Sequence, residues 1–131
     1  MPIGESVQLV KNIALVLLSS AQRTTATNSA DVTDNFGAKS AVVIIDVTSV
    51  NAVTPTLTVT IQGKDPTSGK YYTILTSAAI STVSTVVLRV HPALAASANL
   101  IAKSIMPQTW RVSVAVGDAD ACNYSIGAQL V

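Results

Sequence analysis

The sequence predicts an all-β protein: a single-domain β-sandwich of about seven strands with Greek-key or jelly-roll-like connections. Three observations lead to this fold class. Val and Thr, which are β-branched and suit a pleated sheet, are among the commonest of the 131 residues. Apolar and polar residues alternate with period two in several segments. Clusters of Gly, Pro, Asn and Asp separate these segments, as turn residues do.

The N-terminal third predicts an arm, a strand and a long loop. We expect residues 1–12 to form an extended arm ahead of one domain, residues 13–131. IALVLL, residues 13–18, is an apolar run of strand length, and it is too short for the core of a secretory signal. Residues 19–40 are polar and rich in turn residues, and so long a connection is often a contact loop. We therefore expect the arm and this loop, which carries Phe36, to contact a partner.

The clearest predicted element is a β-hairpin that begins at Thr56. Leu57, Val59 and Ile61 alternate with threonines, which places the aliphatic side chains on one face of a strand. GKDPTSGK then supplies Pro and Gly for a tight turn, which we interpret as a corner of the scaffold. In the returning strand, alternation predicts Tyr72 and Ile74 on one face and Tyr71, Thr73 and Leu75 on the other.

Four further segments show the strand pattern, and one does not. The Ala-rich stretch 92–108 could hold a short helix, because Ala favours helix while its Ser and Asn residues do not. The four strand segments are SAVVIIDVTSV (40–50), STVVLRVHP (84–92), TWRVSVAV (109–116) and CNYSIGAQLV (122–131).

The composition favours assembly and argues against two kinds of partner. Charged residues make up 11% of the chain, against about 25% in a typical soluble domain. The net charge of +1 leaves no basic footprint for nucleic acid or for an anionic membrane, and no segment is apolar for long enough to form a transmembrane helix. A protein with so little charge repulsion is expected to cover part of its apolar surface with other subunits. Cys122 has no second cysteine to pair with, which fits synthesis in a reducing cytoplasm.

No residue pattern indicates catalysis, a cofactor or a metal, so we expect a protein that is not an enzyme. His91 and Cys122 match the spacing of no nucleophile–base family and lack a residue to orient the base. Asp118 and Asp120 could begin a cation site, but an Asp-rich turn explains them better because Asp bonds its own backbone there.

Charged and aromatic residues within the strands are the candidate contact residues. Asp46, Arg89 and Arg111 lie inside strand patterns, where a buried charge needs a partner. We expect at least one Asp–Arg pair, formed either within the chain or between subunits. Tyr71 and Tyr72 are neighbours and cannot both face the core, so one of them is expected at the surface, where an aromatic can anchor a contact.

Several stretches resemble a group of small proteins encoded in the structural gene clusters of tailed bacteriophages and prophages. The stretches are IQGKDPTSGKYY, VLRVHPAL and MPQTWRVSVAVGDADACNYSIGAQLV, and the similarity runs from about residue 20 to the C-terminus. The resemblance implies a virion component, specifically a capsid decoration (cement) protein that trimerises on the shell and clamps its neighbours. Its partners would be the major capsid protein and copies of itself, and its location the capsid surface after synthesis in the host cytoplasm. The resemblance supplies no catalytic residue.

Two other functions stay open at the level of the sequence. The protein could belong to the phage tail or baseplate, since the resemblance does not separate head from tail. A carbohydrate-binding β-sandwich on the virion surface is an alternative of another class. It would need an exposed aromatic platform, for which Trp110, Phe36 and three tyrosines are the available residues.

Overall fold

The protein is built from β-strands. A computed structural model describes residues 13–50, 56–117 and 121–131, and these contain nine strands and no helix. The strands are β1 (Ile13–Arg23), β2 (Thr27–Asn28), β3 (Ala41–Val50), β4 (Leu57–Lys64), β5 (Tyr71–Thr76), β6 (Ser84–Val90), β7 (Ile101–Ala102), β8 (Trp110–Val116) and β9 (Cys122–Leu130). Each of the seven expected strands is present, and β2 and β7 are two-residue additions.

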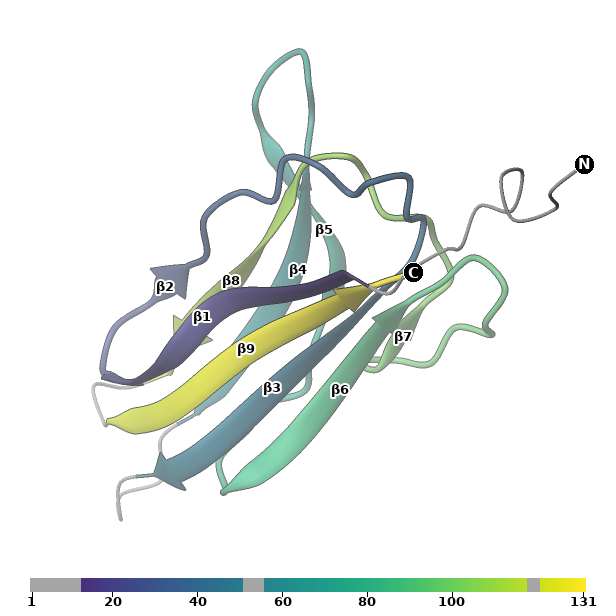
Figure 1. Ribbon diagram of the computed structural model, residues 1–131. Coiled ribbons are helices and arrows are strands. Elements are labelled where there is room, and N and C mark those ends of the chain that lie inside the picture. Colours follow the sequence, from purple (N-terminus) through teal and green to yellow (C-terminus); the bar gives the residue numbers. More distant parts are fainter. Residues whose placement is uncertain (1–12, 51–55, 118–120) are drawn as a thin grey trace, which may run out of the picture.

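The strands form two sheets that pack face to face. The first, which we call sheet A, has the order β1-β9-β3-β6-β7, and the second, sheet B, has the order β2-β8-β4-β5. Figure 1 looks onto sheet A, with the strands of sheet B behind it. The chain crosses from one sheet to the other between β1 and β2, β2 and β3, β3 and β4, β5 and β6, β7 and β8, and β8 and β9.

The strand pairing is nested, and this identifies the topology. β1 pairs with β9, β2 with β8, β3 with β6 and β4 with β5, all antiparallel. The chain therefore runs out and back as one long ribbon of paired strands, folded over into two sheets. This is the jelly-roll arrangement, and it confirms the expected all-β sandwich while choosing between the two predicted types of connection.

Period-two alternation builds the core, as the sequence predicts. Along β4 and along residues 41–47 of β3 every second residue is buried and the residues between them are half-buried, whereas Thr48 and Ser49 are exposed. The inner faces of both sheets supply aliphatic side chains that exclude water, which is the main driving force for this packing. The largest fully buried side chains are Trp110, Tyr124, Ile45, Leu57, Ile61, Leu88, Ile126 and Leu130.

The predicted hairpin is present, but a β-bulge changes which residues of β5 share a face. Gln62 is opposite Thr73, while the neighbouring Ile61 is opposite Leu75, so Ile74 is the extra residue. The bulge shifts the alternation by one position. Leu75 therefore joins Ile61 in the core, and the prediction that it shares a face with Tyr71 and Thr73 is wrong.

The helix considered for residues 92–108 does not form. Residues 92–100 are all exposed, so no apolar side chain of this stretch packs into the core, and short helices without such packing are marginal. Asn99 adopts a left-handed backbone with φ 64°, and Ser97 closes a turn by accepting a hydrogen bond from the Ile101 amide at 2.9 Å. The chain then adds β7 alongside β6.

The long loop begins later than expected, because β1 continues to Arg23 and β2 pairs with β8. The expected arm, residues 1–12, lies outside the described residues.

Candidate functional site: the Phe36 end of the sandwich

The loop before β3 is fastened along the edge of sheet B. The Ser29 amide donates to the Val112 carbonyl at 2.9 Å, and the Val32 amide donates to the Trp110 carbonyl at 2.7 Å. The loop therefore extends the sheet beside β8 before it turns away from it. This backbone pairing fixes the position of the residues that follow, 33–37.

Asn35 holds the turn of the loop to the core. Its side chain is buried, its Oδ1 accepts a hydrogen bond of 2.7 Å from Trp110 Nε1, and its Nδ2 donates to the Pro107 carbonyl. The indole of Trp110 is fully buried, and a buried indole N–H needs an acceptor. Asn35 supplies that acceptor, so the loop and the core depend on one another.

Phe36 is displayed by this anchor. Its side chain is 65% exposed, although Phe is normally buried, and its backbone is left-handed with φ 52°. A left-handed backbone costs a non-glycine residue about 1–2 kcal/mol. Asp34 Oδ1 accepts from the Phe36 amide at 2.7 Å, and the Ala38 amide donates to the Asn35 carbonyl at 2.8 Å, so local hydrogen bonds hold the strained turn. The structure thus holds in place the backbone that carries this exposed aromatic side chain.

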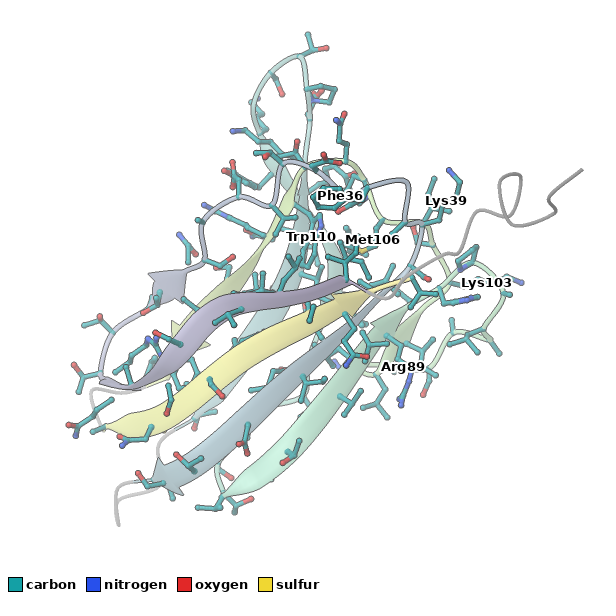
Figure 2. All side chains as sticks on the ribbon, in the orientation of Figure 1. Phe36, Lys39, Arg89, Lys103, Met106 and Trp110 are labelled. Carbon is teal, nitrogen blue, oxygen red and sulfur yellow. The ribbon has the colours of Figure 1, made fainter. Side chains whose placement is uncertain are left out.

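We call the surface around Phe36 the Phe36 end; it presents exposed apolar side chains among polar residues and charged residues of both signs. Tyr72 is 49% exposed and Ile105 is 56% exposed. Two hollows of about 250 and 440 Å³ adjoin here and share Gln108 in their linings. Figure 2 shows Phe36 near Met106 and Trp110, with Lys39 and Lys103 toward the same end of the molecule. Such a surface, with exposed apolar side chains among polar and charged ones, suits a contact with another protein.

Tyr72 belongs to this end because of Gly63. Gly63 is opposite Tyr72 in the hairpin, and the tyrosine ring and Pro107 occupy the space that a side chain at Gly63 would need. The glycine therefore lets Tyr72 lie across the strand toward Pro107. Tyr72 is still the more exposed of the two tyrosines, because Tyr71 is half-buried.

Tyr71 lies in a polar cluster on the outer face of sheet B. Its hydroxyl donates to Asp31 at 2.8 Å, and Lys64 Nζ forms an ion pair of 3.1 Å with the same carboxylate. The Arg111 guanidinium stacks on the Tyr71 ring, 3.5 Å from the ring centroid, and its Nε donates to Gln62 Oε1 at 2.9 Å. The cluster joins the loop before β3 to the hairpin.

The pKa directions support a structural role for this cluster. The hydrogen bond from Tyr71 lowers the pKa of Asp31 below its ordinary value of 3.8; Lys64 and Arg111 add to this effect and burial opposes it. Asp31 in turn raises the pKa of Lys64 above 10.5. Both shifts favour the charged forms, so the ion pair is stable near neutral pH and offers no group ready to exchange a proton.

Asp46 does not pair with either arginine within the chain, which was one of the two alternatives that the sequence left open. Asp46 Oδ1 accepts from Thr85 Oγ1 at 3.2 Å, and Arg89 lies opposite Val42, further along the sheet. Arg111 is on the other sheet, in the cluster described above. Over residues 13–50, 56–117 and 121–131 the ion pair that forms is that of Lys64 and Asp31. A pair between subunits stays a prediction.

The structure separates the remaining candidates. His91 follows Val90, which pairs with one end of β3, and Cys122 pairs with the other end of β3. The two ends of this strand are about 30 Å apart, so His91 and Cys122 do not meet. Asp118 and Asp120 lie outside the described residues. Within the described part of the chain no three His, Cys, Asp or Glu side chains gather as metal ligands would, and no helix has the length and apolar character to span a membrane.

Sequence reasoning missed Asn35 and Asp31. The turn sequence DNFG signals that the backbone reverses near Asn35, but nothing local indicates its bond to Trp110. Burial of Trp110 also removes the largest ring from the aromatic platform considered for a carbohydrate site.

Comparison with known proteins identifies the fold. No protein-family model matches the chain, and no curated protein matches it in sequence. Among solved structures, the SPBc2 prophage-derived protein YomS is similar, with a TM-score of 0.54 and 8% sequence identity over 95% of this chain and 97% of YomS. The two proteins therefore share the sandwich fold over nearly their whole lengths.

Proposed function

We propose that the protein is a non-enzymatic structural component of a bacteriophage particle, and specifically a decoration protein that binds and stabilises the assembled head. Two findings support a phage role: the sequence stretches that resemble phage structural proteins, and the fold shared with a prophage-derived protein of similar extent. The partner would be the major capsid protein, and the protein would bind from the outside of the shell as a homo-oligomer, a trimer if it follows the resemblance. Nucleic acid and membrane have no part in this proposal.

The observation that carries the proposal is the display of Phe36 on an anchored turn. Because hydrogen bonds already hold this turn, its backbone loses little conformational entropy on binding, so more of the contact energy is retained. Aromatic residues that enter a partner's pocket commonly dominate the energy of an interface. Repetition of the same contact around a symmetric shell would add the effect of multivalency.

Binding to undecorated particles tests this function. Particles would be prepared from the phage that encodes the chain after deletion of its gene, and the purified protein would be added back. We expect saturable binding in co-sedimentation and regular density on the outer head surface in electron cryo-microscopy. Density on the tail or baseplate would assign the protein there instead, and absence of binding to any part of the particle would reject a virion role.

Phe36→Ala tests the contact itself. If the ring enters a pocket of the shell, the substitution should weaken binding by at least about 30-fold, which corresponds to the ~2 kcal/mol that marks an interface hot spot. Val83→Ala is the matched control, because Val83 is 60% exposed and precedes β6, away from the Phe36 end. Equal binding by both variants would show that Phe36 is not the contact.

A further inference from the structure

The outer face of sheet A is not covered by any described part of the chain. Figure 1 looks directly onto this face, where β1, β9, β3 and β6 lie in front. Val42, Ile44 and Val87 are half-buried there between their neighbours, and Val16 is 79% exposed, the most of any large apolar side chain in the described residues.

The strand register aligns apolar residues in a row across this face. Val16 is opposite Gly127, Gly127 is opposite Ile44, and Ile44 is opposite Val87. Residues directly opposite one another in antiparallel strands project from the same face of the sheet. The row therefore crosses four strands, and Gly127 leaves a dip between Val16 and Ile44.

Opposite charges flank this row along β3 and β6. On one side Val42 is opposite the exposed Arg89, and on the other Asp46 is opposite Thr85. Thr85 donates a hydrogen bond to Asp46, and no described residue forms an ion pair with Asp46 or Arg89. Along the two strands the face is thus positive, then apolar, then negative.

We propose that this face binds the same face of a second copy of the protein. The two copies are related by a two-fold axis that lies in the plane of the interface and passes between Ile44 and Val87. A two-fold contact that reverses the strand direction inverts the order of the charges. Arg89 of each copy then faces Asp46 of the other, and the apolar rows meet between the two ion pairs. The opposite orientation would bring like charges together, so the charges also select the direction of pairing.

The pairing does not rest on the proposed role in the phage head. It uses the outer face of sheet A and leaves the Phe36 end available. It predicts a two-fold contact that is distinct from the three-fold contact implied by the resemblance, and this contact contains the Asp–Arg pair between subunits that the sequence leads us to expect.

Charge reversal and mixing test the pairing. In sedimentation velocity at about 100 μM the wild-type protein should be a dimer, which loses affinity as salt screens the ion pairs. Asp46→Arg and Arg89→Asp should each raise the dimer dissociation constant at least about 100-fold, because each places like charges opposite one another. An equimolar mixture of the two variants should form dimers again, since every facing pair is then of opposite charge.

The control is Lys70→Asp, which changes the net charge as much as Arg89→Asp does but lies in the exposed hairpin turn between β4 and β5 of sheet B, and it should leave the dimer unchanged. Far-ultraviolet circular dichroism would verify that each variant is folded, and Ile44→Ser gives a second, uncharged disruption. A monomeric wild-type protein, variants that still dimerise, or a mixture that stays monomeric would each overturn the proposal.

Discussion

At the scale of the residue, the Phe36 end depends on Asn35. This side chain satisfies the indole N–H of a fully buried tryptophan and the carbonyl of Pro107 at the same time. The two ends of the Trp110–Asn35 bond are 75 residues apart in sequence. Sequence patterns describe residues that are close together in the chain. They therefore led us to expect Phe36 in a contact loop, but they could not reveal the distant tryptophan that anchors the loop.

Asn35→Ala is expected to lower the free energy of unfolding by about 1–3 kcal/mol, because it leaves a buried donor without its acceptor. Urea denaturation followed by tryptophan fluorescence would measure the change, since Trp110 reports on its own surroundings. Asn28→Ala is the control: Asn28 is exposed, and its replacement should change stability by less than about 0.5 kcal/mol. Equal effects at both positions would contradict the anchoring role.

The lowered pKa of Asp31 predicts how the stability of the protein changes at acidic pH. The pKa of this carboxyl is lower in the folded protein than the ordinary 3.8, chiefly because Tyr71 donates to it. A lowered pKa contributes stability that is present above the unfolded-state value and is lost as the pH falls through the folded-state value. Wild-type protein should therefore be more stable than Asp31→Asn at neutral pH, and the difference should shrink once the pH falls below 3.8.

Urea midpoints of both proteins, measured from neutral pH down to about pH 2, would test this sign. The Asp65 carboxyl, whose pKa is also lowered, by the Thr67 amide above all, is common to both proteins and cancels in the comparison. A difference that does not depend on pH would mean that Asp31 acts through packing alone.

At the scale of the element, alternation of apolar and polar residues was enough to predict the strands. It did not predict which residues share a face of the sheet where a bulge shifts the register. The β4–β5 hairpin follows from its alternating residues and from the turn residues between them. The bulge at Ile74 has no sequence signal, because Ile suits either face of a strand, and it reversed the expected orientation of Leu75. The Ala-rich segment failed as a helix for a related reason: propensity without a face to bury does not stabilise a helix.

The hairpin turn requires glycine at one position. Gly69 has φ 73°, and its amide donates to the Asp65 carbonyl at 2.9 Å to close the turn. A side chain there would meet only the far end of Lys64, so the penalty of Gly69→Ala is in the backbone and should be about 1–2 kcal/mol. Thr67→Ala, in the same exposed turn, should cost less than about 0.5 kcal/mol in the same denaturation assay. A neutral Gly69→Ala variant would contradict this account of the turn.

At the scale of the whole molecule, composition and alternation predicted a single β-sandwich, and the described residues contain one. The order of strands in each sheet could not be predicted, because no residue pattern within a strand identifies the distant strand with which it pairs. The same holds for surfaces. The charges of Asp46 and Arg89 drew attention in the sequence, but only the register shows that an apolar row lies between them.

The nested pairing also sets the order of events when the protein is made. Ile13 pairs with Leu130, so one of the earliest strands to leave the ribosome waits for one of the latest before its hydrogen bonds can form. Contacts between such distant segments carry a large loop-closure entropy and slow the folding of β-proteins. Until β9 emerges, the apolar β1 has no native neighbour in its sheet, and a nascent chain stalled at that stage would expose a strand prone to aggregation.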